Sequence, residues 1–138
     1  MKVVFATVLI TVVVIDQLSK ATSNTITLNT AGPFSVAVSN IVATFVAGAL
    51  LLVAVLVTAA LYRRLHQTQL IGLALIIGGG ITNLADRLRF GGVRDIGEIA
   101  TMAFNLADVA ITLGAIVLIG WTVLPGSRIR QATESKTN

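Results

Sequence analysis

The sequence predicts an all-α membrane protein with four transmembrane helices and a small extracytoplasmic β element. Apolar residues make up 55% of its 138 residues and charged residues only 12%, whereas soluble domains are about a quarter charged. The mean hydropathy is +0.91. Four apolar runs approach the roughly 20 residues that a helix needs to cross a bilayer. We expect residues 1–125 to form one transmembrane domain and residues 126–138 a polar cytoplasmic tail.

The first run, Val3–Ile15, is unbroken apart from threonine and is short for a membrane span. We therefore expect the helix to continue into "DQLSK", residues 16–20. A cleavable signal peptide is the alternative, but the polar stretch that follows has no clean small-x-small cleavage site, which favours a retained helix. In that stretch "TITLN" alternates and predicts a short strand, and "AGPF" predicts a turn.

The remaining runs predict three more spans. Residues 41–61 are interrupted only by Thr44 and Thr58, residues 70–85 read "LIGLALIIGGGITNLA", and residues 102–124 end the apolar part of the chain. The basic segment "YRRLHQTQ" connects the second span to the third. The segment "DRLRFGGVRDIGEIAT", residues 86–101, connects the third to the fourth and holds most of the mid-chain charge.

Four spans place both termini on one side of the membrane. That side holds six basic residues: Lys2, Arg63, Arg64, Arg128, Arg130 and Lys136. The other side holds four: Lys20, Arg87, Arg89 and Arg94. The positive-inside rule then predicts cytoplasmic termini. The same rule accounts for the net charge of +4, so we do not expect a nucleic-acid partner.

Five of the six acidic residues fall near the predicted extracytoplasmic face: Asp16, Asp86, Asp95, Glu98 and Asp108. Ionisable groups at membrane depth are costly and usually functional, so this clustering indicates a site. The chain has no Cys and a single His, which excludes cysteine-ligated and multi-histidine metal centres. No Ser lies in a G-x-S-x-G setting, so the sequence offers no better nucleophile than the acids. We expect neither a metal nor a cofactor.

Asp108 lies about six residues into the fourth predicted span, roughly 9 Å below its start at about 1.5 Å per residue. Asn105 is three residues earlier on the same helical face, and its amide is expected to orient the Asp108 carboxylate. Asp95, in the preceding loop, is the natural partner, because two close carboxylates share a proton and can activate water. The alternatives are a helix-bridging Asp108 and a solvated Asp95 paired with Arg94.

Two further clusters flank these acids. In "GGGITNLADR", residues 78–87, the glycines allow another helix to approach closely, and Asn83 and Asp86 lie one turn apart at the end of a span. A polar helix cap is the alternative interpretation. In "DQLSK", Asp16 and Lys20 have the spacing and order of a helical ion pair, and Lys20 can also reach toward lipid headgroups.

In order, the chain reads "DQLSK", "NTAGPF", "GGGITNLADRLRFGGVRD" and "AFNLAD". This ordered set, spread over residues 16–114, resembles the lipoprotein signal peptidase (signal peptidase II) family. The resemblance implies a four-helix membrane aspartic endopeptidase that cleaves prolipoproteins before a diacylglyceryl-modified cysteine. It also implies a monomer in the bacterial inner membrane, in contact with membrane lipid and prolipoprotein, with its active site at the extracytoplasmic face.

The resemblance further implies that Asp95 and Asp108 are the catalytic pair. Supporting or substrate-binding positions are implied for the residues that match the other motifs: Asp16, Lys20, Asn29, Asn83, Asp86, Arg87 and Asn105. The chain departs from the family pattern at several positions. "NTAGPF" replaces N-x-G-A-A-F, Thr82 replaces a glycine, Ile96 replaces the usual phenylalanine, and the extracytoplasmic segments are short.

Three other functions fit the residues alone. A proton-coupled transporter or channel would use the outer-face acids, although such a path is expected to carry acids deep in the spans or on both faces. A non-catalytic assembly subunit would use the glycines for helix packing. A degenerate, inactive member of the same family is the third alternative.

Overall fold

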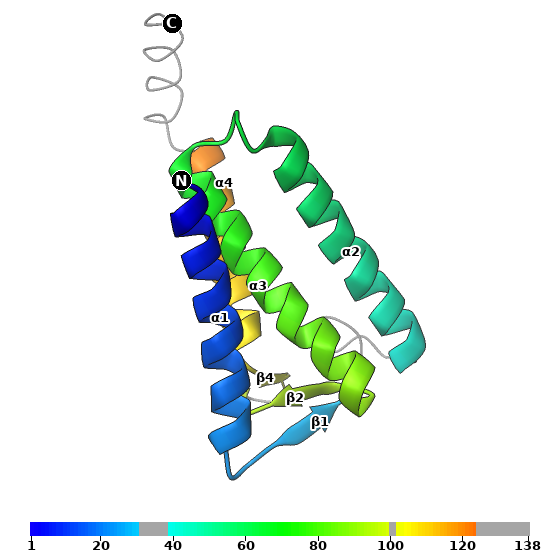
Figure 1. Cartoon of the computed structure of the whole chain (residues 1–138). Helices are drawn as coiled ribbons and strands as arrows, with labels where there is room; N and C mark the ends of the chain where they lie inside the picture. The colour runs from blue at the N-terminus through cyan, green and yellow to red at the C-terminus, as the bar shows by residue number, and fades with distance from the viewer. Residues whose placement is uncertain (31–38, 100–101, 124–138) are drawn as a thin grey trace, which may run out of the picture.

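Four helices dominate the computed structural model, which describes residues 1–30, 39–99 and 102–123 (Figure 1). They are α1 (Lys2–Thr22), α2 (Asn40–Leu61), α3 (Gln67–Phe90) and α4 (Leu106–Val123). Each is long and apolar enough to cross a membrane, which confirms the predicted fold class. The predicted "AGPF" turn and the tail of residues 126–138 lie outside the described residues.

Four short strands gather at the end of the bundle away from the N-terminus (Figure 1). β1 (Thr27–Asn29) pairs antiparallel with β2 (Val93–Asp95), and β3 (Gly97–Ile99) pairs antiparallel with β4 (Met102–Phe104). The strand predicted within "TITLN" is therefore present. The second pair was not predicted, and it makes α4 begin later than expected, because the first residues of the predicted span are used in β4.

These bounds move two groups of predicted site residues. Asp108 lies in the first turn of α4, not about six residues into a longer span. Asp86 and Arg87 lie inside α3, which continues to Phe90 and ends at Gly91 in the left-handed conformation. Since Gly91 adopts a φ of 74°, which costs glycine little, the chain can turn sharply there and enter β2.

The helix α3 packs against the three other helices, and its glycine run Gly78–Gly80 faces each of them in turn. A side chain on the first glycine would meet the Leu9 carbonyl oxygen of α1 at 3.1 Å. A side chain on the second would meet the Ala107 carbonyl oxygen of α4 at 2.6 Å, and one on the third would meet the Leu51 side chain of α2 at 3.1 Å. Small residues thus set the helix spacing, as is usual in membranes.

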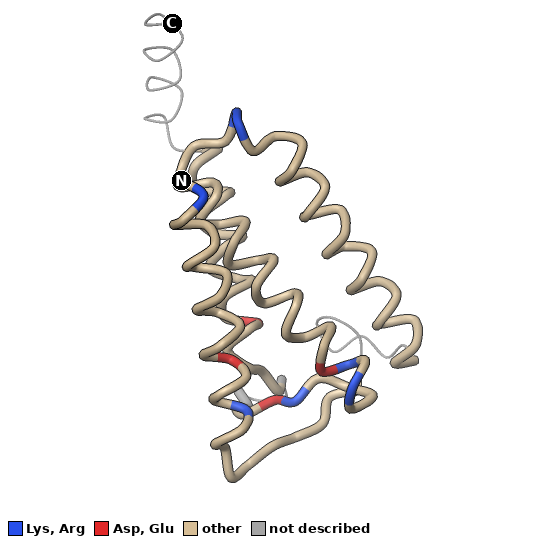
Figure 2. The backbone as a smooth tube through the Cα atoms, viewed as in Figure 1, with Lys and Arg blue, Asp and Glu red and all other residues tan. Residues whose placement is uncertain are grey.

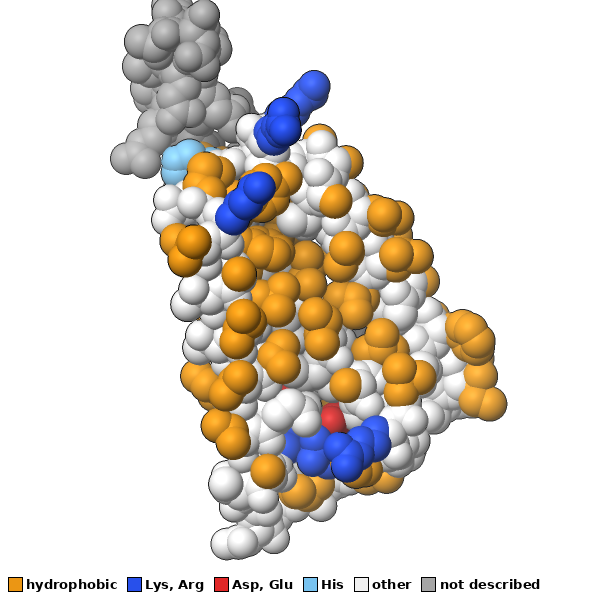
Figure 3. Space-filling view, in the orientation of Figure 1, with side chains coloured by type: hydrophobic (Ala, Val, Ile, Leu, Met, Phe, Trp, Pro, Cys, Tyr) orange, Lys and Arg blue, Asp and Glu red, His pale blue; other side chains and the backbone are white. Residues whose placement is uncertain are grey.

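The surface and interior are arranged as expected for a protein in lipid. Large apolar side chains cover the middle of the molecule (Figure 3), and α2 exposes many of them, including Phe45 at 76%. The buried side chains include small residues and several charged ones. Figure 2 shows the acids of the described residues at the strand end of the bundle, with basic residues there and at the opposite end.

Candidate functional site

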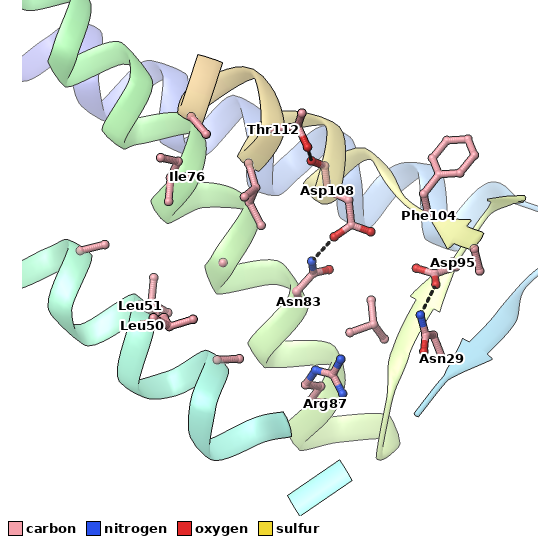
Figure 4. A pocket seen from close by; sticks show the side chains of 17 residues that line it. Asn29, Leu50, Leu51, Ile76, Asn83, Arg87, Asp95, Phe104, Asp108 and Thr112 are labelled. Atoms are coloured by element: carbon pink, nitrogen blue, oxygen red, sulfur yellow. Dashed lines mark hydrogen bonds between the residues drawn. The ribbon is translucent and has the colours of Figure 1, made fainter. Parts of the chain in front are cut away.

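A cavity of about 700 Å³ lies between α2, α3, α4 and the strands (Figure 4). Its wall within the helices is mostly apolar and includes Leu51, Ile76 and Ile111. Its strand end is polar and carries five of the predicted site residues: Asn29, Asn83, Arg87, Asp95 and Asp108. The two carboxylates expected to act together therefore line one cavity.

Asp95 occupies the last position of β2 and is only 2% exposed. Both of its carboxylate oxygens accept hydrogen bonds from asparagine side chains. The Asn29 amide of β1 donates to Oδ2 at 3.0 Å, and the Asn105 amide donates to Oδ1 at 2.7 Å. Asn29 and Asp95 meet because β1 and β2 are paired, which brings residues 66 positions apart into contact.

Asp108 enters the cavity from the first turn of α4. The Asn83 amide of α3 donates to its Oδ1 at 2.8 Å (Figure 4), and the Asn105 backbone N–H donates to its Oδ2 at 3.3 Å. In return, the Asn105 side-chain oxygen accepts from the Asp108 backbone N–H at 3.0 Å. This reciprocal arrangement is that of a capping box, which satisfies otherwise free N–H groups where a helix begins.

Asn105 therefore has a different role from the one predicted. Its side-chain amide was expected to orient Asp108, but it donates to Asp95, and Asp108 is contacted by the backbone N–H instead. The reason is local, because the Asn105 side-chain oxygen caps α4 and leaves its NH₂ group free to reach β2. Asn105 is fully buried and connects both carboxylates.

Lys20 is also placed differently from one of the predictions. Its side chain does not extend toward headgroups but is buried, 1% exposed, between two carboxylates. Its Nζ lies 2.7 Å from Asp16 and 3.0 Å from Asp86. The predicted ion pair with Asp16 is present, and Asp16 also accepts from the Ala107 backbone N–H of α4 at 2.9 Å. Lys20 donates to Asn83 Oδ1 at 3.4 Å, next to the amide that holds Asp108.

Arg94 does not pair with Asp95, as the alternative interpretation of that loop required. Its guanidinium lies 2.8 Å from Asp86 instead. Successive side chains of a strand point to opposite faces, so Arg94 and Asp95 lead away from each other. One hydrogen bond of Arg87, to the Asn40 side chain, was not predicted either. Its Nη1 donates to Asn40 at 3.1 Å and ties α3 to the first turn of α2.

The four acids whose side chains are described in this region thus fall into two classes. Asp16 and Asp86 account for the three ion pairs among the described residues, with Lys20 and Arg94 as the cations. Asp95 and Asp108 are held by amides instead. Neutral amide donors thus fix these two carboxylates, and the Arg87 guanidinium lines the same cavity.

The fold and this site define a class: a four-helix integral membrane protein whose two amide-held carboxylates line one largely apolar cavity. A family model described as signal peptidase (SPase) II matches residues 20–124. The chain therefore belongs to the signal peptidase II family, in agreement with the resemblance of its motifs. The match gives no support to the alternative of a proton-coupled transporter or channel.

Curated relatives point to the same family. The chain is 44% identical over 82 residues to a lipoprotein signal peptidase from Moorella thermoacetica, which covers 56% of this chain and 54% of that protein. It is 38% identical over 76 residues to one from Sphingopyxis alaskensis, which covers 51% of this chain and 44% of that protein. The matched segments span about half the length of these relatives.

Solved structures share the fold. One described as a bacterial membrane enzyme structure by the in meso method at 1.9 Å resolution has a TM-score of 0.70 and 20% identity, over 88% of this chain and 93% of that one. A second, described in the same words at 2.3 Å, has a TM-score of 0.69 and 19% identity, over 83% and 84%. At these identities the likeness concerns the fold alone.

Proposed function

We propose that this protein is a membrane aspartic endopeptidase that removes signal peptides from prolipoproteins by cleaving before the diacylglyceryl-modified cysteine. The observation that carries the proposal is the pair Asp95 and Asp108, held by asparagine amides in one cavity and absent from the ion pairs of the described residues. Membership of the signal peptidase II family supports this reaction class.

In the proposed reaction the pair holds one proton and one water molecule. The ionised carboxylate takes a proton from the water, whose oxygen attacks the scissile carbonyl carbon, while the protonated carboxyl gives its proton to the carbonyl oxygen. In the second step the first carboxyl protonates the leaving nitrogen and the second recovers a proton from the diol. The C–N bond breaks and the pair returns to its starting state. The roles of base and acid are proposed for the pair and are not assigned to either aspartate alone.

The cavity supports the proposed substrate. Its polar end holds the two acids, whereas Leu50, Leu51 and Ile76 make an apolar wall inside the bundle. An apolar signal segment and acyl chains fit such a wall, and a peptide bond at the membrane surface would then meet the carboxylates. Arg87 and the asparagines that line the polar end are proposed to support the acids or contact the substrate.

We propose that the termini face the cytoplasm of a bacterial cell and that the acids face the extracytoplasmic side of the inner membrane. The distribution of lysine and arginine supports this orientation. We further propose that the chain acts as a monomer, since the acids and the amides that hold them all come from one chain. Its partners are the prolipoprotein and membrane lipid, with no nucleic acid, metal or cofactor.

The test uses the purified protein in lipid vesicles with a diacylglyceryl-modified lipopeptide and its unmodified counterpart. The wild type is expected to cleave the modified peptide alone, before the cysteine. Asp95→Asn and Asp108→Asn are each expected to lower kcat by about 10²–10⁴-fold, the usual contribution of general acid–base catalysis. Glu134→Gln, which removes the acid that lies outside the predicted extracytoplasmic cluster, is the control and retains activity. Full activity of either aspartate variant would refute the dyad.

A further inference from the structure

The strand that carries Asp95 is fixed on both sides of that residue. Before it, the Arg94 backbone N–H donates to Asp86 Oδ2 at 3.1 Å. After it, the Ile96 backbone N–H donates to the Phe104 carbonyl oxygen of β4 at 3.1 Å. Among the described residues β2 pairs only with β1, and a two-stranded sheet is marginally stable alone. The contact with Asp86 adds a hydrogen bond between β2 and α3.

The Arg94 side chain strengthens the same contact. Its Nη2 donates to Asp86 Oδ1 at 2.8 Å and to Gln17 Oε1 at 2.8 Å, and its Nε lies 3.3 Å from Asp86 Oδ1. The guanidinium also lies over the Phe90 ring, 4.3 Å from its centre. Arg94 thus connects β2 to both α1 and α3, and the planar guanidinium fits several acceptors at once.

Asp86, which accepts the hydrogen bonds from Arg94, is itself held by a second cation, Lys20. Its Oδ2 lies 3.0 Å from Lys20 Nζ, and its side chain is 1% exposed. The two cations and the two acids of this cluster, Asp16 and Asp86, balance in charge. The Arg94 side chain is the partly open member, 17% exposed. Arg94→Ala therefore removes this attachment of β2 and leaves Lys20 as the one cation of the cluster, whereas Arg94→Lys keeps the charge.

We infer that Arg94 is a positioning residue of the proposed reaction: by clamping β2 to Asp86 and Gln17 it sets the place of the Asp95 carboxylate relative to Asp108. This inference rests on the proposed function. Alternation along the strand turns the two side chains to opposite faces, so the clamp holds Asp95 without touching the reacting atoms. A misplacement of about 1 Å can cost about 10²-fold in rate.

The test compares Arg94→Ala with Arg89→Ala. Arg89 is a matched control because it carries the same charge, lies near the same Phe90 ring at 5.2 Å, and makes none of the ion pairs with Asp86. Arg94→Ala is expected to lower kcat by about 10–100-fold, with KM within about twofold, while Arg89→Ala changes neither by more than about twofold. The kcat of Arg94→Lys is expected to lie between those of the wild type and Arg94→Ala. If Arg94→Ala does not fold, Arg94→Lys is compared with Arg89→Ala instead.

Added guanidinium chloride at millimolar concentration provides a second readout, because the Arg94 side chain is partly open to solvent. It is expected to restore part of the kcat of Arg94→Ala and to leave Arg89→Ala unchanged, an effect that a general loss of stability would not produce. Equal kcat for the two alanine variants in an active preparation would overturn the inference.

Hydrogen exchange separates this inference from the proposed function. The peptide covering residues 91–97 is expected to exchange faster in Arg94→Ala than in the wild type and Arg89→Ala, whether or not the wild type cleaves lipopeptide. Unchanged exchange in that peptide would contradict the clamp. An inactive wild type that shows the expected exchange difference would instead refute the proposed function and leave the clamp supported.

Discussion

At the scale of single residues, Asn105 contacts both acids of the cavity, Asp95 through its side-chain amide and Asp108 through its backbone N–H. Spacing and motif order predicted Asp95 and Asp108 together with the asparagines around them. Neither signal could show that Asn105 donates to Asp95, because that contact depends on a strand and a helix cap that meet in three dimensions. The contacts made by Asn40, Gln17 and Arg94 were missed for the same reason, since each joins different elements.

Asn105→Ala is expected to separate stability from activity. Loss of the cap of α4 should reduce the free energy of unfolding by about 0.5–2 kcal/mol, whereas kcat should fall by much more than this cost explains, because Asp95 loses one of its two asparagine donors. Ser39→Ala is the matched control, since Ser39 caps α2 by accepting from the Val42 backbone N–H at 3.4 Å. Thermal unfolding and lipopeptide cleavage are measured for both. A parallel effect of the two variants on kcat would contradict this role.

Lys20→Met is expected to destabilise the protein by about 3–5 kcal/mol, the usual cost of removing one partner of a buried ion pair. Among the described ion pairs, the variant leaves Asp16 with none and Asp86 with Arg94 alone. Lys2→Met, at the exposed start of α1, should change the unfolding free energy by less than about 0.5 kcal/mol. Adding Asp16→Asn to Lys20→Met should recover part of the loss, and no recovery would argue against the charge explanation.

At the scale of elements, helix existence was predictable and helix limits were not. The apolar runs predicted four helices, because lipid demands length and apolarity. The predicted start of α4 was wrong because Met102–Phe104 pairs with β3 as a strand. A stretch of three residues gives no strand signal that outweighs its apolar surroundings. The helix α3 extends beyond the apolar run because Asp86 and Arg87 are themselves buried and find polar partners in Lys20 and Asn40.

Gly79→Ala tests the contact between α3 and α4. The new methyl group would meet the Ala107 carbonyl oxygen at 2.6 Å, and a backbone atom cannot turn aside, so α4 has to shift beside Asp108. We expect a loss of about 1–3 kcal/mol in unfolding free energy, typical of overpacking, together with reduced kcat. Gly120→Ala, where the methyl group meets nothing within 4 Å, should be neutral or stabilising by up to about 1 kcal/mol. Equal melting temperatures of the two variants would exclude this packing role.

At the scale of the whole molecule, the polar end of the bundle is built from every part of the chain. α1 contributes Lys20, β1 contributes Asn29, α3 contributes Asn83, and the last third contributes both proposed catalytic acids. The motif order in the sequence was therefore more informative than any one motif. The cavity could not be predicted, since its volume depends on how α2 stands relative to α3 and α4.

The orientation in the membrane can be measured directly because the chain has no native cysteine. Thr25→Cys, exposed between α1 and β1, is expected to react with a membrane-impermeant maleimide added outside the inner membrane. Gln67→Cys, exposed at the start of α3, should react only after the membrane is permeabilised. Neither change alters the count of lysine and arginine. The reverse labelling pattern would show that the positive-inside prediction is wrong.

The double use of Asn105 also has a consequence for the order of events during biosynthesis. One side chain both begins α4 and holds Asp95, and a ribosome makes α4 after the three other helices. Until that last helix inserts, Asp95 lacks one of its two amide donors and Asp108 has not entered the membrane. A partly made chain in the bilayer therefore lacks the assembled carboxylate pair, and the proposed site is complete only when the whole bundle has formed.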